Sequence, residues 1–200
     1  MRWIEGSNVA ESIQELIQEA DAECRRLSIP MLGPHKAAYL CELIREEQPK
    51  VVVEVGTAIG YSGLWIARTL RELGQGKLIT LEQDDARADQ AMRYFRRGGV
   101  EHIITLLRGD ARTRIAEIDN TIDFLFLDGG FENYHPCLLA CREKLRDGAM
   151  LVADNAGIGA AEMADYLALV RRSGESRTEW FETDLEWNPR DAMEITVLRM

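Results

Sequence analysis

Acidic residues stand at the ends of several apolar runs in this sequence. Glu54, Glu82, Asp110 and Asp128 end or follow such runs, and the pair Asp154-Asn155 follows another. One acid at the end of a strand is weak evidence of a site, but five are hard to attribute to solvation alone. In an open doubly wound sheet, ligands bind beyond the carboxyl ends of the strands. We therefore expect these side chains to form one binding site.

The stretch "VVVEVGTAIGYSG", residues 51–63, contains a glycine-rich turn after the first of these runs. Gly56 permits close approach of the backbone, and Gly60 permits a helix to begin tightly against a ligand. Ala58 stands where the dinucleotide fingerprint needs its second glycine. This disfavours an NAD-dependent oxidoreductase and favours a smaller zwitterionic cofactor. Glu82 ends the next run, where an acid can accept both hydroxyls of a ribose. The alternative for the turn alone is a pair of helix-boundary glycines without a ligand.

Hydrophobic periodicity predicts the elements that must position these residues. The predicted helices span 8–28, 35–47, 61–74, 84–99, 111–118, 134–148 and 160–174. The predicted strands span 50–55, 77–82, 102–110, 121–128, 149–155, 176–183 and 192–199. Such alternation predicts an α/β fold with a parallel sheet that helices cover on both faces. The last two strands lack a helix between them, so we expect an antiparallel hairpin at one edge.

Composition narrows the classes of function. Of the 200 residues, 46% are hydrophobic and 29% are charged, which is ordinary for a soluble globular chain. The sequence shows neither a membrane-spanning apolar run nor a signal peptide. Its four cysteines form no CxxC pair, so we expect buried thiols in a cytoplasmic protein. The net charge of −10 argues against broad binding to nucleic acids or membranes.

Five segments together resemble a known enzyme family. They are "VVVEVGTAIGYSGLWIA", "LITLEQD", "LLRGDA", "IDFLFLDGGFENY" and "LVADN". They resemble class I S-adenosylmethionine-dependent O-methyltransferases, and most of all the metal-dependent branch that includes the catechol and caffeoyl-CoA enzymes. The resemblance covers the chain from about residue 30 onward. It implies a Rossmann-like, seven-stranded, mostly parallel sheet in a single domain over 1–200, with helices of 1–48 covering the site and a core over 49–200.

The resemblance also implies a set of residues that bind S-adenosylmethionine. Glu54 and the backbone around Gly56 would face the amino-acid end, Ser62 would bond the carboxylate, and Glu82 would take the ribose hydroxyls. Asp110 and Ala111 would border the adenine, and Leu32 would close over the cofactor. The complete predicted set is Leu32, Glu54, Gly56, Thr57, Gly60, Tyr61, Ser62, Glu82, Gln83, Asp110, Ala111 and Asp128.

A metal site follows from the same resemblance. Family members bind a divalent cation through residues that correspond here to Asp128, Asp154 and Asn155. Oxygen ligands select Mg²⁺, Mn²⁺ or Ca²⁺ over zinc. A cation bound to the acceptor hydroxyl would lower its pKa and orient it for methyl transfer. The alternative is that Asp128 and Asp154-Asn155 only cap the helices that follow them.

The chain departs from the family at the general base. Family members have a lysine three residues after the metal aspartate, and here that position is Phe131. Glu186, His135 and Lys36 are the alternatives, of which Glu186 and Lys36 are our predicted catalytic residues. A metal that suffices without a base, and altered chemistry, are two further explanations.

The acceptor is predicted only by class. Trp3, Trp180, Trp187 and Phe131 could line a pocket for a small phenolic, catechol-like molecule that carries a hydroxyl group. A hydroxylated wobble uridine of tRNA is the enzymatic alternative, although the acidic balance counts against it. A non-catalytic S-adenosylmethionine-binding module is the alternative of another class. We also expect a homodimer, as is common in the family.

Overall fold

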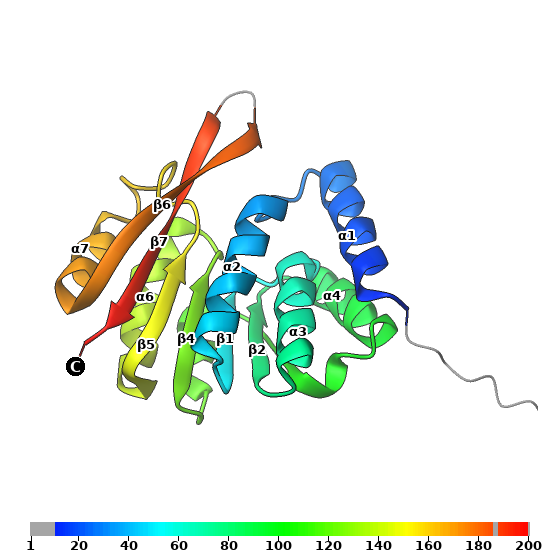
Figure 1. Cartoon of the computed structure of the whole chain (residues 1–200), viewed down its shortest axis with the longest axis horizontal. Helices are drawn as coiled ribbons and strands as arrows, with labels where there is room; N and C mark the ends of the chain where they lie inside the picture. Colours follow the sequence, from blue (N-terminus) through cyan, green and yellow to red (C-terminus); the bar gives the residue numbers. More distant parts are fainter. Residues whose placement is uncertain (1–10, 186–187, 200) are drawn as a thin grey trace, which may run out of the picture.

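The computed structural model describes residues 11–185 and 188–199. Seven α-helices, three short 3₁₀ segments and seven strands follow one another along these residues (Figure 1). The helices are α1 (Ile13–Leu27), α2 (Pro34–Glu47), α3 (Tyr61–Leu73), α4 (Asp85–Arg97), α5 (Ala111–Arg114), α6 (Phe131–Cys141) and α7 (Ala164–Ser173). The 3₁₀ segments are η1 (Glu101–Ile103), η2 (Ile115–Glu117) and η3 (Arg142–Lys144). The strands are β1 (Val51–Val55), β2 (Lys77–Glu82), β3 (Ile104–Arg108), β4 (Ile122–Leu127), β5 (Leu145–Ala153), β6 (Gly174–Leu185) and β7 (Asn188–Leu198).

The strands form one sheet in the order β3-β2-β1-β4-β5-β7-β6. The first five are parallel to one another, and β7 pairs antiparallel with both β5 and β6. The chain goes outward from β1 to β3 and then returns to β4 on the other side of β1. The switch point of the sheet therefore lies between β1 and β4, where this architecture binds ligands.

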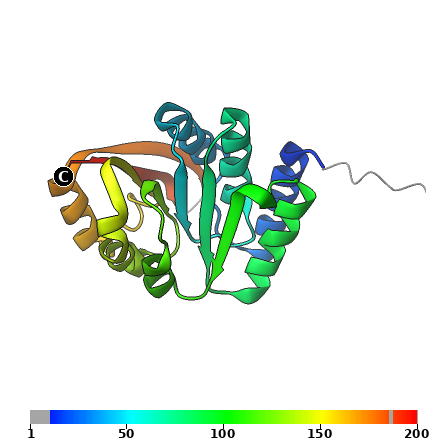
Figure 2. The same cartoon turned by 90° about the horizontal axis from the view of Figure 1, so that it is seen from below.

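Alternate residues of the central strands enter different cores. Val52 packs with α1 to α4 on one face of the sheet, whereas Val51 and Val53 pack with α6 and α7 on the other. Figure 2 shows these two groups of helices on opposite sides of the strands. The apolar run of β1 is buried throughout because both faces of the sheet are covered.

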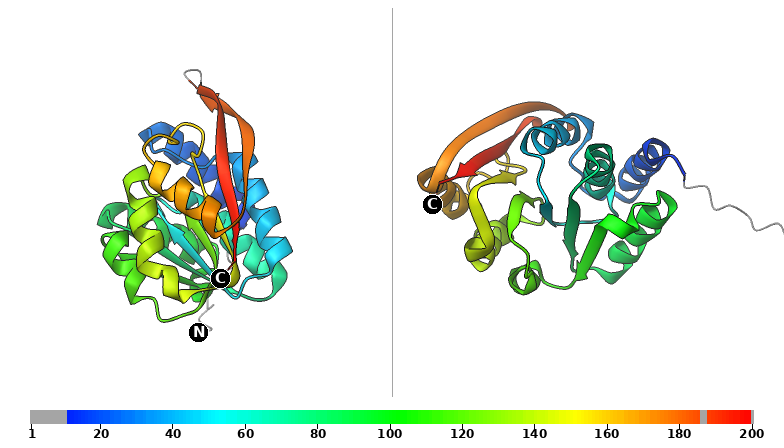
Figure 3. Two further views of the ribbon diagram at one scale, coloured as in Figure 1. Left: turned by 90° about the vertical axis from the view of Figure 1, so that its left-hand side faces the viewer. Right: turned by 60° about the horizontal axis from the view of Figure 1, so that its bottom comes forward.

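The β6–β7 hairpin extends past the carboxyl end of β5. Ala153, the last residue of β5, pairs with Glu194, so the first half of β7 continues beyond the parallel strands (Figure 3). β7 runs antiparallel to its neighbours, and its amino end therefore lies beside the carboxyl end of β5. This placement brings a late segment of the chain to the predicted site.

The predicted fold class is confirmed: the sheet has seven strands, is mostly parallel, and ends in the edge hairpin. Several predicted boundaries were wrong. The predicted helix 134–148 begins at Phe131 and ends at Cys141, because Leu145 already pairs with Ile122 in the sheet. The predicted helix 160–174 begins only at Ala164, after a series of turns. Residues 8–10 of the first predicted helix lie outside the described residues.

Helix α1 is attached to the rest of the fold by apolar and polar contacts. Its residues Leu16, Ile17 and Ala20 are buried in the core of this face. Arg97, at the end of α4, donates hydrogen bonds to Glu11 and Glu19. No helix within the described ranges is long and apolar enough to cross a membrane.

Candidate active site

The carboxyl ends of β1, β4 and β5 lie next to one another. Val55 pairs with Leu127, and Leu127 pairs with Ala153. The next residues continue these ladders: the Asp128 N–H donates to the Val55 carbonyl (2.9 Å), and the Asp154 N–H donates to the Leu127 carbonyl (2.9 Å). The structure therefore brings the predicted metal residues to one edge of the sheet.

The turn after β1 requires glycine at Gly56. Its φ is +101°, and a Cβ there would lie 2.4 Å from the carbonyl oxygen of Asp128. The close neighbour of Gly56 is thus the backbone that follows β4. Gly60 also has a positive φ, +95°, and its carbonyl accepts the first hydrogen bond within α3, from Leu64 (2.9 Å). The N–H groups that precede Leu64 are left at the positive end of the helix, where an anion is favoured.

Glu54 is fully buried beneath this turn. The Ser62 hydroxyl donates to one of its oxygens (2.6 Å) and the Thr80 hydroxyl donates to the other (2.6 Å). A further hydrogen bond of 2.5 Å joins Thr80 to Thr57. Burial raises the pKa of Glu54 to about 7, although the two hydroxyl donors act in the opposite direction. Glu54 thus ionises near neutral pH.

Glu82 ties the turn to the end of β2. Its carboxylate accepts hydrogen bonds from the N–H groups of Ala58 (2.8 Å) and Asp84 (2.9 Å). A carboxylate has about four acceptor positions, so two remain for hydroxyl donors. The neighbouring Gln83 is exposed.

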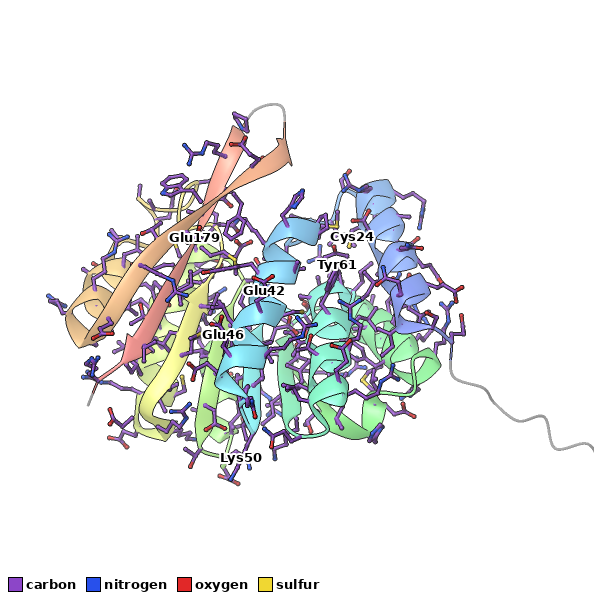
Figure 4. The ribbon with its side chains drawn as sticks, viewed as in Figure 1. Cys24, Glu42, Glu46, Lys50, Tyr61 and Glu179 are labelled. Atoms are coloured by element: carbon purple, nitrogen blue, oxygen red, sulfur yellow. The ribbon has the colours of Figure 1, made fainter. Side chains whose placement is uncertain are left out.

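The other residues predicted to bind the cofactor lie after β3, before α2 and at the start of α3. Asp110 caps α5, which begins at Ala111, and pairs with the guanidinium of Arg112, which lowers the pKa of Asp110. Leu32 is buried just before α2. Tyr61 is buried at the start of α3, beside Cys24 of α1 (Figure 4).

A buried lysine lies between two carboxylates at the same edge. The Lys36 Nζ atom is 2.6 Å from Asp154 Oδ1 and 2.5 Å from Asp191 Oδ2. Asn155 Nδ2 donates to the same Asp191 oxygen (2.7 Å), and the Ile158 N–H donates to the other oxygen (3.0 Å). Lys36 comes from the first turn of α2, and Asp191 comes from β7.

The charges of this cluster influence one another. Burial alone would lower the pKa of Lys36, but attraction and hydrogen bonds from Asp154 and Asp191 outweigh it and raise the pKa. Burial raises the pKa of Asp154 to about 6, against the attraction of Lys36. Burial and the nearby Asp154 raise the pKa of Asp128 well above its usual range. The pKa of Asp191 is lowered, because hydrogen bonds from Lys36, Ile158 and Asn155 outweigh its burial.

The arrangement of oxygens fits a hard divalent cation. Lys36 occupies one oxygen of Asp154, and Asp191 holds the nitrogen of the Asn155 amide, which leaves its oxygen for another partner. No hydrogen bond to the Asp128 carboxylate is found within 11–185 and 188–199. No group of three or more His, Cys, Asp or Glu side chains in those ranges is arranged to hold a metal, so such a site needs the Asn155 oxygen.

The capping alternatives do not explain these residues. α6 begins after Gly130 without a side-chain cap, so Asp128 caps no helix. α7 begins after Met163, well beyond Asn155 in the sequence, again without a side-chain cap.

Of the remaining predicted residues, Phe131 and Trp180 lie against the turn after β5, at Gly159 and Gly157. Trp180 is 51% exposed beneath the guanidinium of Arg190. Glu186, Trp187 and Trp3 lie outside the described residues, and the structure describes no contact of the His135 side chain with the cluster.

Asp191 is the residue of this cluster that the sequence reasoning missed. The available signal was an acid directly before the predicted strand 192–199. Because that strand was expected to be antiparallel, its start and not its end faces the site.

Comparisons with known proteins agree with this geometry. A family described as "Methyltransferase domain" matches residues 53–156. Catechol O-methyltransferase B of Danio rerio is 32% identical over 193 residues, covering 92% of this chain and 72% of that protein. The chain belongs to the class I S-adenosylmethionine-dependent O-methyltransferases of the catechol and caffeoyl-CoA type.

Two further similarities support the assignment of this methyltransferase. Catechol O-methyltransferase of Sus scrofa is 30% identical over 176 residues, which cover 84% of this chain and 92% of that protein. The O-methyltransferase TomG of Streptomyces achromogenes, solved in complex with SAM, has a TM-score of 0.80 over 93% of this chain and 90% of that chain. Its identity of 22% shows a shared fold alone. The chain is thus an S-adenosylmethionine-dependent O-methyltransferase. The tRNA alternative and the non-catalytic alternative gain no support from these similarities.

Proposed function

We propose that the methyltransferase acts on a hydroxyl group of a small, catechol-like aromatic acceptor. The observation that carries the proposal is the cluster of the buried Lys36 and Asp154 with the partly buried Asp128 and Asn155, beside the turn at Gly56. The similarity to two catechol O-methyltransferases supports the acceptor class.

The turn and its neighbours are proposed to hold the methyl donor. The helix start at Tyr61 and Ser62 favours the carboxylate of the donor, and Glu54 lies below it. The Ser62 hydroxyl donates its only proton to Glu54. The backbone N–H groups therefore remain as the donors for the carboxylate of the methyl donor. Glu82 retains two acceptor positions for the ribose.

Asp128, Asp154 and Asn155 are proposed to hold a divalent cation through oxygen atoms. Such a cation, which would be Mg²⁺, Mn²⁺ or Ca²⁺, lowers the pKa of a bound hydroxyl and orients it. Lys36 contributes a fixed positive charge beside Asp154. Its ammonium donates to two carboxylates, so we assign it a role in charge compensation instead of the predicted role of base. Glu186 as the base, the homodimer and the cytoplasmic location stay predictions.

An assay of methyl transfer with labelled S-adenosylmethionine tests the proposal. The wild-type protein is expected to methylate at least one member of a panel of catechols in the presence of Mg²⁺. Asp154→Asn is expected to lower this rate at least about 100-fold, because it weakens both the proposed cation site and the contact with Lys36.

Asp165→Asn is the matched control, since Asp165 is exposed in the first turn of α7, away from the cluster. It should retain the wild-type rate within a factor of about two. A wild-type rate in Asp154→Asn would contradict the assigned site, and failure of every catechol would contradict the assigned acceptor.

A further inference from the structure

Asp191 connects three segments of the site through one buried carboxylate. Its side chain is 2% exposed, and it accepts hydrogen bonds from Lys36 of α2, from Asn155 after β5 and from the backbone of Ile158. These three donors account for both of its oxygens. The proposed function uses this residue only as a partner of the Lys36 ammonium.

The chemistry of a carboxylate determines how Asn155 is oriented. An ionised aspartate only accepts hydrogen bonds, whereas an amide presents a donor on one side and an acceptor on the other. Asn155 must therefore face Asp191 with its nitrogen, which leaves its oxygen for a different partner. If residue 191 were a donor, the opposite orientation of the amide would be favoured.

The backbone turns sharply at Asn155, beside Asp191. Asn155 has a φ of +58°, a left-handed conformation that asparagine adopts more readily than most residues with a side chain. The following turn approaches Asp191 so closely that a Cβ on Gly157 would lie 2.9 Å from Asp191 Oδ1. The Ile158 N–H then completes the contact. The turn after β5 is thus built around the Asp191 carboxylate.

We infer that Asp191 is a positioning residue that keeps the Asn155 oxygen available as a ligand for a divalent cation. The same carboxylate holds the Lys36 ammonium against Asp154. The inference depends on the proposed function for the presence of the cation. Asp191 itself does not have to contact the cation. Partners of this kind fix the orientation of metal ligands, and their loss weakens metal binding about 10- to 100-fold.

Calorimetric titration of Mn²⁺ into the protein saturated with S-adenosylhomocysteine tests the inference. Asp191→Asn keeps the shape of the side chain but leaves one acceptor oxygen and no charge for three donors. The contacts cannot all persist, so we expect a 10- to 100-fold weaker affinity for Mn²⁺. Its affinity for S-adenosylhomocysteine should stay at the wild-type value. Glu194→Gln is the matched control: it neutralises a buried carboxylate of the same strand whose partners are Arg171 and Thr178. This control should bind Mn²⁺ like the wild type.

An exchange of the two groups distinguishes positioning from a merely structural role. The double variant Asn155→Asp/Asp191→Asn restores one carboxylate opposite one amide. The new carboxylate at position 155 is a stronger cation ligand than an amide, so Asn155→Asp alone is the reference. We expect the double variant to bind Mn²⁺ at least as tightly as Asn155→Asp, because the amide at position 191 then donates to the carboxylate. Binding at least about tenfold weaker than that of Asn155→Asp overturns the inference, also where Asp191→Asn alone does not fold.

The wild-type protein provides a readout that needs no variant at position 191. The side-chain amide protons of Asn155 should exchange slowly with solvent in nuclear magnetic resonance spectra, because Asp191 accepts from Nδ2. Rapid exchange would overturn the inference, as would wild-type Mn²⁺ affinity in Asp191→Asn or no Mn²⁺ binding by the wild type.

The methyl-transfer assay separates the two proposals. Transfer to a catechol together with unchanged Mn²⁺ affinity in Asp191→Asn overturns the inference alone. No transfer together with weakened Mn²⁺ affinity overturns the proposed function alone.

Discussion

Glu54 is a buried acid whose surroundings raise its pKa. Its carboxyl group is inaccessible to solvent and has only hydroxyl groups as hydrogen-bond donors, so burial dominates and raises its pKa from 4.5 to about 7. The folded state therefore binds this proton more tightly than the unfolded state does. The stabilisation from the bound proton is complete below about pH 4.5, and it is lost as the pH rises through 7.

We predict that the free energy of unfolding of the wild type, relative to Glu54→Gln, falls by roughly 3 kcal/mol as the pH rises from about 4.5 to 8. Urea denaturation of both proteins across this range measures the difference. Glu46→Gln, on the exposed side of α2 (Figure 4), should change the free energy of unfolding by less than about 0.5 kcal/mol at any pH. A pH-independent difference between the wild type and Glu54→Gln would show that Glu54 is ionised throughout.

At the scale of elements, the turn from β1 to α3 depends on the approach of β4. Gly56 combines a positive φ with a Cβ position 2.4 Å from the Asp128 carbonyl oxygen, whereas Gly74 has a positive φ but open space around it. We predict that Gly74→Ala lowers the free energy of unfolding by about 1 kcal/mol, because only the left-handed backbone conformation disfavours alanine there. Gly56→Ala should cost at least about 3 kcal/mol, because the backbones of two strand ends must also separate. Chemical denaturation compares the two variants, and equal costs would contradict the close approach.

The elements also show what could be predicted from this sequence. Alternating apolar runs sufficed for the succession of helices and strands along the chain and for the edge hairpin, because each run had to bury one or both faces. The strand-end acids were predictable, since parallel strands end at one edge. The contact of Lys36 with Asp191 could not be predicted, because it joins residues from opposite ends of the chain through tertiary packing. The end of α6 was misjudged because the segment after it is held by distant partners, among them the ion pair of Arg146 with Asp123.

At the scale of the whole molecule, the site exists only when the fold is complete. Its groups come from α2, from the ends of β1, β4 and β5, and from the start of β7. A ligand bound there contacts segments that are distant in sequence, so it binds the folded state and not the unfolded chain. Such a ligand stabilises the whole molecule by mass action.

We therefore predict that S-adenosylmethionine and S-adenosylhomocysteine each raise the melting temperature and that NAD does not. At about 100 times the dissociation constant a ligand adds roughly 2.7 kcal/mol, which corresponds to a shift of about 5 to 10 °C for a chain of this size. NAD should give no shift, because Ala58 occupies the position of the second glycine that a pyrophosphate requires. Thermal unfolding followed by circular dichroism, with and without Mg²⁺, measures these shifts. Glu82→Ala should show a smaller shift with either sulfur compound, since its carboxylate both fixes the turn at Ala58 and offers acceptors to the ribose. Stabilisation by NAD, or by neither sulfur compound, would contradict the interpretation of the turn from which the assignment of every other ligand-binding residue follows.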